Sequence, residues 1–204
     1  MTLLPLGKRV PMFASDKADV SGSEVIIHPA ICFLFVLDPA PAATFNIETF
    51  TDVPKGGRRP NPDPLCRRHA NLSLDMVADI IPELEGLNAH GAAIYVAVNQ
   101  CEGQRSKATV TRVRGVHADF DGAPPENLEA VRARLQPTIE VQSSAPDRRH
   151  FYWLVKDSET ITLDLAEAIN RGLVELGADP AATDVSRLLR LPGFRHMKYR
   201  QVRA

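Results

Sequence analysis

The chain has 204 residues, of which 44% are apolar and 24% charged, and a net charge of −1, which is ordinary for a soluble globular protein of one large or two small domains. No apolar run approaches the roughly 18 residues that a membrane span needs, and the N-terminal residues lack the long apolar region of a signal peptide. Cys32, Cys66 and Cys101 form no Cys-x-x-Cys pair, which argues against a disulfide framework or a zinc site and predicts a cytoplasmic protein.

Basic residues gather in two segments despite the net charge near zero. The first segment contains Arg105, Lys107, Arg112 and Arg114. The second follows Asp184 and contains Arg187, Arg190, Arg195, Lys198, Arg200 and Arg203. Most charged runs are solvated surface, but clustered Lys and Arg are also what a polyanion site needs, so both interpretations stay open here.

The N-terminal part of the chain predicts one strand. Residues 1–30 have little periodicity and are expected to form a loosely attached arm, and residues 31–37 are a short apolar run. Residues 44–52 alternate between two faces, which is typical of a half-buried strand. The Gly, Pro and Asn residues of 54–64 predict a loop.

Helices and strands alternate in the remainder of the chain. Residues 73–88 have apolar side chains at helical spacing after Ser73, a favourable N-cap, and Pro82 is expected to break them into two short helices. Further elements are predicted as a strand at 92–99, a strand at 115–121, a helix at 126–135, a hairpin of 138–144 and 149–155, a helix at 161–176 and a strand at 186–191. This order predicts an α+β fold with a largely antiparallel sheet.

Two aspartates flank a phenylalanine at the end of the strand 115–121. Because side chains two apart on a strand point the same way, Asp119 and Asp121 share a face while Phe120 points into the core. Two carboxylates this close repel each other unless a positive charge lies between them, and Mg²⁺ or Mn²⁺ suits carboxylate oxygens. The alternative is a plain turn in which Asp121 caps the next helix.

Two other Asp-rich motifs fit this stretch less well. A calcium-binding EF-hand loop that starts at Asp119 would place Ala123, Pro124 and Ala130 where an acid or amide, a glycine and a glutamate are needed. The first motif of haloacid dehalogenase-type phosphatases resembles the sequence DFDG, but that family has Thr where this chain has Ala123, and its motif lies near the start of the fold.

Two more groups of residues have the chemistry of a phosphate or metal site. His150 opens the second strand of the hairpin, with Arg148 and Tyr152 on the same face, and the Ser143-Ser144 strand end lies across from it. A single His on a strand is more often structural, whereas a His beside arginines suits phosphate binding.

Asp184 precedes Arg187 and Arg190, and Lys198 follows a Pro-Gly turn. An ion-pair network is one interpretation of this stretch. With Asp119 and Asp121, however, Asp184 supplies a third carboxylate, and three carboxylates can hold two cations about 4 Å apart.

Together these motifs resemble those of the archaeo-eukaryotic primase superfamily, in particular the plasmid- and phage-type replication protein B primases. That family has Asp-hydrophobic-Asp on one strand, a Ser-rich turn leading to a His at a strand start, and then an Asp followed by Arg, a Leu-Pro-Gly turn and a Lys. The corresponding residues here are Asp119-Phe120-Asp121, Ser143-Ser144 with His150, and Asp184 with Arg187, Arg190, Leu191-Pro192-Gly193 and Lys198. The resemblance covers about residues 31–200.

The resemblance implies a palm like an RNA-recognition motif, expected at 115–204, beside a smaller N-terminal α/β unit at 31–114. It implies that Asp119, Asp121 and Asp184 bind two Mg²⁺ or Mn²⁺ ions, and that these residues and His150 are catalytic. The implied nucleotide- or phosphate-binding residues are Ser144, Arg148, His150, Arg187, Arg190 and Lys198.

The implied function is template-directed nucleotidyl transfer by a DNA primase or primase-polymerase, which makes primers on single-stranded DNA from nucleoside triphosphates in plasmid, phage or mobile-element replication. A helicase or helical-bundle domain acting in trans is an expected partner, and no membrane is expected. Two alternatives stay open: a non-catalytic, replication-associated DNA-binding module, and a metal-dependent phosphohydrolase with Asp119 as the nucleophile.

Overall fold

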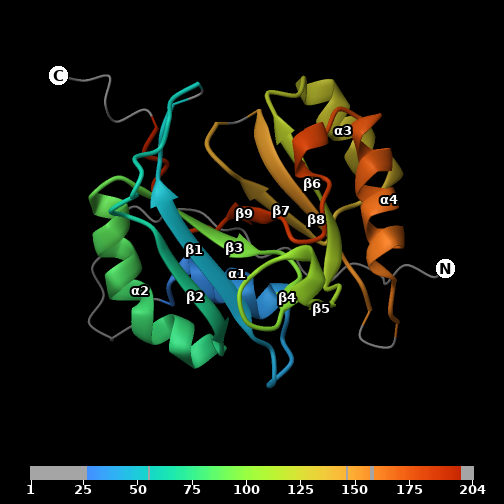
Figure 1. Cartoon of the computed structure of the whole chain (residues 1–204). Coiled ribbons are helices and arrows are strands. Elements are labelled where there is room, and N and C mark those ends of the chain that lie inside the picture. Colours follow the sequence, from blue (N-terminus) through green and yellow to red (C-terminus); the bar gives the residue numbers. More distant parts are fainter. Residues whose placement is uncertain (1–26, 55, 146, 157–158, 199–204) are drawn as a thin grey trace, which may run out of the picture.

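The computed structural model describes residues 27–54, 56–145, 147–156 and 159–198, so most of the expected arm at 1–30 lies outside the described residues. The two larger of the three β-sheets in the described residues lie side by side, with α2 on the outer side of one and α3 and α4 on the outer side of the other, and β4 and β5 form a small third sheet (Figure 1). All strand pairs are antiparallel, which confirms the predicted α+β class. None of the helices in the described part of the chain is long and apolar enough to cross a membrane.

The first sheet has four strands in the order β2-β1-β3-β9. Its elements, with the two helices that pack on it, are α1 (Pro29–Leu37), β1 (Phe45–Thr51), β2 (Arg67–Leu72), α2 (Leu74–Ala89), β3 (Ala92–Ala97) and β9 (Leu188–Arg190). Phe45 and Ile47 of β1 are fully buried against Leu34 of α1 and Leu84 of α2. The alternate residues of β1, starting with Asn46, therefore lie on the opposite, polar face of this sheet.

The second sheet has three strands in the order β6-β8-β7. Its elements and helices are β6 (Gly115–Asp121), α3 (Pro125–Arg134), β7 (Ile139–Gln142), β8 (Arg148–Leu154) and α4 (Leu163–Val174). Phe120, Phe151 and Trp153 pack on one another and on apolar residues of α3 and α4. Short elements connect the two sheets: β4 (Gln100–Cys101), η1 (Lys107–Thr109), β5 (Val110–Arg112) and η2 (Pro180–Ala182).

The structure corrects one expectation, the break at Pro82, and adds two elements that the sequence did not predict. The apolar run at 31–37 belongs to helix α1, which begins where the His28 ring accepts a hydrogen bond from the Ala30 amide at 3.2 Å. Helix α2 continues through Pro82, because Pro82 lies on the exposed side while Val77, Ile81 and Leu84 stay buried on the other. Strand β2 was not expected from its polar residues, and forms because its backbone pairs with β1.

The last strand returns to the first sheet. In the β3–β9 pair, Tyr95 lies opposite Arg190 and Ala97 opposite Leu188. A segment of the expected unit at 115–204 thus completes the sheet of the expected unit at 31–114, and the division of the chain at these residues remains a prediction.

A buried ion pair connects the elements of both sheets. Asp38, at the end of α1, accepts a hydrogen bond from Arg114 Nε at 2.6 Å, and a second, shorter contact from Arg112. The Arg114 guanidinium also lies 4.7 Å from the ring of Phe45 on β1, and its backbone leads directly into β6. The side chains of Asp38 and Arg114 are 3% and 1% exposed, so neither charge is screened by water.

Replacing Asp38 with Ala is expected to destabilise the fold by about 3–5 kcal/mol, because it leaves the buried guanidinium of Arg114 without its carboxylate. Urea denaturation of D38A and of the parent protein measures this. D79A, which removes an exposed acid from α2, is the matched control and is expected to change stability by less than about 0.5 kcal/mol. Equal stability of D38A and D79A would contradict this role for Asp38.

Candidate active site

The register between β6 and β8 brings acidic and basic side chains together. Asp119 lies opposite His150, and Asp121 lies opposite Arg148. The His150 Nε2 atom is 3.6 Å from Asp119 Oδ1, and Arg148 Nη1 is 2.6 Å from Asp121 Oδ1. The two aspartates therefore share the face of the sheet that points away from the core of α3 and α4. Asp121 does not cap α3, whose N-cap residue is Pro124.

Asp119 lies in a negative environment. Its side chain is 22% exposed, and burial raises its pKa to about 6. The negative charges of Asp121 and Asp179 contribute to this rise, while Arg187 and Arg148 act in the opposite direction. The carboxylate form of Asp119 is thus disfavoured in the protein alone, and a cation bound beside it would relieve the repulsion.

His150 is held as a neutral imidazole. Burial lowers its pKa to about 3, and the positive charges of Arg190 and Arg187 contribute to this shift. Its Nδ1 atom is buried and has no hydrogen-bond partner among the described residues. A neutral ring has one N–H donor and one acceptor, so His150 can donate to a phosphate oxygen without adding a charge.

Asp184 lies beside Arg187, whose positive charge also acts on Asp119. It accepts a hydrogen bond from the Ser186 hydroxyl at 2.8 Å, and its other oxygen is 3.8 Å from Arg187 Nη1. In the part of the chain that the structure describes, no three His, Cys, Asp or Glu side chains form a group that could hold a metal ion. Asp184 is therefore linked to Asp119 and Asp121 through the charge of Arg187, and not as a third ligand in direct contact.

The backbone around Asp184 is held by side chains from outside its segment. Asn99 donates to the Val185 carbonyl at 3.0 Å, and its Oδ1 accepts from the Arg114 amide at 2.9 Å, just before β6. The other side chains that hydrogen-bond the backbone of residues 183–186 are Arg105, Glu167 and Asn170. Asp184 thus owes its position to tertiary contacts.

The predicted phosphate-binding residues converge from distant elements. The pKa of His196 is lowered to about 4, first by burial and then by the charges of Arg190, Lys198 and Arg148, which outweigh the opposite effect of Asp52, so these cations act on one imidazole. Arg190 is held by a hydrogen bond of 2.8 Å from its Nη2 to Asp52 Oδ1. Ser144 lies half-buried in the turn between β7 and β8.

Sequence reasoning missed three residues of this region. Asp52, whose side chain is 1% exposed, binds Arg190 and accepts a hydrogen bond from the Met197 amide at 3.0 Å. His117 precedes Asp119 by two residues, so the alternation that paired the aspartates could have revealed it. His196 lies in a segment without periodicity, and only the charges gathered around it in the fold identify it.

The donor chemistry of this site fits a divalent cation. Asp119 and Asp121 present carboxylate oxygens on one face, and the raised pKa of Asp119 reflects its burial first and the charges of Asp121 and Asp179 second. Asp184, whose side chain is 43% exposed, is not grouped with this pair in the described part of the chain. Arg148, which contacts Asp121, partly neutralises the pair in this structure.

Three solved structures are similar to this fold. The crystal structure of primase RepB′ aligns with a TM-score of 0.58 at 23% identity, over 83% of this chain and 50% of that one. Its catalytic domain in complex with initiator DNA aligns with a TM-score of 0.58 at 23% identity, over 84% of this chain and 79% of that one. The AEP domain of the cyanophage S-2L primase-polymerase aligns with a TM-score of 0.60 at 18% identity, over 83% of each chain.

These likenesses confirm the expected primase fold. The chain spans about half the length of the whole RepB′ primase, as its 50% coverage shows. None of the curated proteins matches this chain. The sequence model of the RepB DNA-primase N-terminal domain matches residues 76–203, which is more than half of the chain and includes the aspartate pair, His150 and Asp184. The chain therefore belongs to the RepB-type DNA primase family.

Proposed function

We propose that this chain is the catalytic domain of a DNA primase or primase-polymerase, which joins nucleoside triphosphates on a single-stranded DNA template in plasmid, phage or mobile-element replication. The observation that carries this proposal is the β6–β8 register, which sets Asp119 and Asp121 against His150 and Arg148 in a chain of the primase family. The complex of the RepB′ catalytic domain with initiator DNA supports a DNA substrate.

Metal ions have a defined place in this proposal. Asp119, Asp121 and Asp184 would hold two Mg²⁺ or Mn²⁺ ions, which lower the pKa of an attacking hydroxyl and neutralise a leaving pyrophosphate. The burial that raises the pKa of Asp119, together with the nearby charges of Asp121 and Asp179, supports this role, because both disfavour a carboxylate that no cation compensates.

The basic residues would bind the phosphates. His150, as a neutral donor, and Arg148 lie beside the aspartates, while Arg187 contacts Asp184 and its charge acts on Asp119. Asp52 holds Arg190 in one position, so less conformational freedom is lost when a phosphate binds. Lys198 and Ser144 complete the proposed set of phosphate-binding residues.

The proposal extends to the setting of the reaction. Primer synthesis would take place in the cytoplasm, with a helicase or a helical-bundle domain supplied in trans to hold the template. In this chain the two sheets would then form the two sides of the catalytic cleft, with Asp119 and Asp121 on the second sheet and Arg190 on the first.

Replacing Asp119 or Asp121 with Ala is expected to lower primer synthesis at least 100-fold, because each change removes a charge that positions the cations. The assay measures labelled products on single-stranded DNA templates with each nucleotide type and with Mg²⁺ or Mn²⁺. D79A, an exposed change on α2, is the control and keeps full activity.

Unchanged product in D119A and D121A would overturn the proposed function. DNA binding that survives EDTA, with no incorporation by the parent protein, would instead favour a non-catalytic binding module. Release of phosphate from simple phosphate esters, lost in D119A, would favour a phosphohydrolase.

Replacing Asp119 with Asn is expected to stabilise the metal-free protein by about 1–3 kcal/mol at pH 8. Folding raises the pKa of this carboxyl from 3.8 to about 6. The protonated carboxyl therefore contributes fully to the stability of the folded state below pH 4, and this contribution is lost as the pH rises through 6. The advantage of D119N should therefore vanish near pH 4. Urea denaturation in EDTA at pH 4 and pH 8 measures it, and a constant difference at both pH values would contradict the assigned cause.

A further inference from the structure

The polar face of the first sheet is lined by aromatic and charged side chains. In the strand register, Glu48 lies opposite both Arg68 and Tyr95, and Tyr95 lies opposite Arg190. These side chains therefore point to the same side as Phe50, away from the core of α1 and α2. Two pockets open on this face, and Arg105 lines both of them.

The first pocket, the aromatic pocket, has a volume of about 310 Å³ and is lined by Phe50, Arg59, Tyr95, Arg105, Asp184, Arg187 and Leu188. The rings of Phe50 and Tyr95 lie 6.2 Å apart. The Arg59 guanidinium lies 4.4 Å from the centre of the Phe50 ring, and that of Arg190 lies 5.2 Å from the Tyr95 ring. Half-exposed aromatic rings beside arginines are the surface on which bases of single strands stack.

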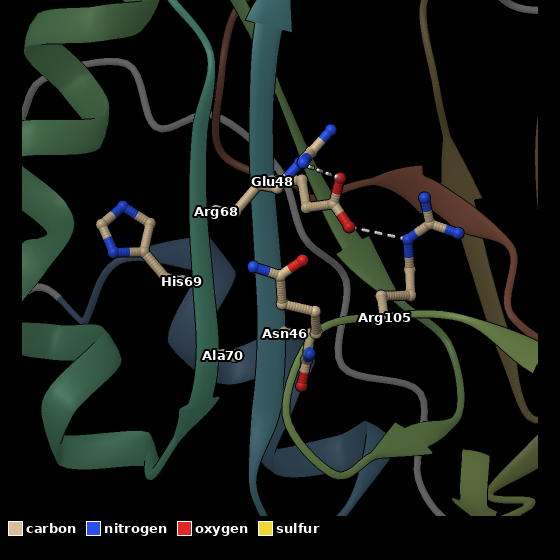
Figure 2. Close-up of a pocket in the computed structure, with 7 residues that line it drawn as sticks. Asn46, Glu48, Arg68, His69, Ala70 and Arg105 are labelled. Atoms are coloured by element: carbon tan, nitrogen blue, oxygen red, sulfur yellow. Dashed lines mark hydrogen bonds and ion pairs between the residues drawn. The ribbon is translucent and has the colours of Figure 1, made fainter. Parts of the chain in front are cut away.

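The second pocket, the Glu48 pocket, has a volume of about 160 Å³ and is lined by Asn46, Glu48, Arg68, His69, Ala70, Gln104 and Arg105. Figure 2 shows the Glu48 carboxylate between the side chains of Arg68 and Arg105, while His69 points away from it. This volume is below the ~300–1,000 Å³ of pockets that enclose a drug-sized ligand, so it suits one base inserted by its edge.

The acceptor capacity of Glu48 is only partly used. Arg105 Nε donates to Oε1 at 2.7 Å, whereas Arg68 Nε lies 3.7 Å from Oε2, too far for a hydrogen bond. The Arg68 side chain is 60% exposed and can move aside, while the Glu48 side chain is 6% exposed and fixed. The pocket thus presents a buried carboxylate that can accept further N–H donors.

Among the four bases, guanine matches a carboxylate best. Its N1–H and N2–H groups are neighbouring donors, so they can pair with both carboxylate oxygens at once. Adenine and cytosine each have an acceptor beside their amino group, and the single N–H of thymine lies between two carbonyls. A carboxylate therefore meets two donors only on the edge of guanine.

We propose that the Glu48 pocket recognises a guanine of single-stranded DNA while a neighbouring base stacks in the aromatic pocket. This inference rests on the proposed function and names a template preference for the same site. Arg105 contacts Glu48 and also donates to the Ser186 carbonyl at 2.9 Å, and the Ser186 hydroxyl in turn binds Asp184. The bound guanine is thereby held at a fixed place relative to the proposed metal ligands.

The loop that carries Arg105 is itself anchored to the sheet. Asn46 Nδ2 donates to the Gly103 carbonyl at 2.7 Å, and the Gly103 amide donates to Asn71 Oδ1 at 3.0 Å. The pocket is therefore formed before a base enters it, which lowers the entropic cost of binding.

Fluorescence anisotropy of the whole chain with labelled oligothymidine, in EDTA and without nucleotides, tests this proposal. One central position is varied among the four bases. The strand with dG is expected to bind about tenfold more tightly than the other three. E48Q, whose amide has a single acceptor oxygen, is expected to lose this preference while its affinity for plain oligothymidine changes less than twofold.

Two further variants make the test specific. E83Q changes a Glu of α2 that faces His69 on the other side of β2, at 3.8 Å, and is the matched control that keeps the dG preference. F50L is expected to weaken binding of all four strands about tenfold without changing the preference, because it removes only a stacking surface.

Equal binding of the four strands by the parent protein, or a dG preference that persists in E48Q, would overturn the recognition. Unchanged affinity in F50L would overturn the stacking. The binding assay contains neither metal nor nucleotides, so its result does not depend on catalysis. A dG preference in this assay, combined with no primer synthesis in the separate activity assay, would support the Glu48 pocket and count only against the catalytic proposal.

Discussion

The antiparallel register between β6 and β8 is the constraint on which the candidate active site depends. Side chains alternate along each strand, so a slip of one residue would turn Asp119 and Asp121 toward the helices and Phe120 toward the other side. The core opposes such a slip, because Phe120 and Phe151 are fully buried together. At Gly115 the strands approach so closely that a Cβ atom would lie 2.7 Å from the Trp153 carbonyl.

The same register concentrates unfavourable charge on the polar face of the second sheet. Asp119 is held near Asp121 and Asp179, and His150 is buried among arginines, so each group is shifted away from its charged form. Packing on the opposite face of the sheet must offset this cost. The charges of these aspartates and arginines stay uncompensated until a ligand binds. Bound cations or phosphates would then compensate them, so the arrangement favours ligand binding.

The site also depends on contacts between the two sheets. Arg190 belongs to the first sheet, and its partner Asp52 lies 138 residues away in the sequence. The backbone next to Asp184 is held by Asn99, which follows β3, and by Arg105, which also binds Glu48 of β1. Contacts between the two sheets therefore position Asp184. The Asp38–Arg114 ion pair stabilises the same contact region from the end of α1.

The sequence by itself determined the elements whose pattern is local. Strand 115–121, the hairpin around His150 and the helix that ends near Gly177 follow from periods of 2.0 and 3.6 residues, and the shared face of Asp119 and Asp121 follows with them. Helix α1 was not predicted because its residues are apolar on all sides, so no polar stripe reveals a helical period. Strand β2 was not predicted because its residues are polar, and only its backbone pairing with β1 makes it a strand. Only the tertiary structure decided that β9 completes the first sheet, that Asp52 holds Arg190 and that Glu48 faces a pocket. Those contacts join residues far apart in the chain, and their energies come from burial and charge that no local pattern encodes.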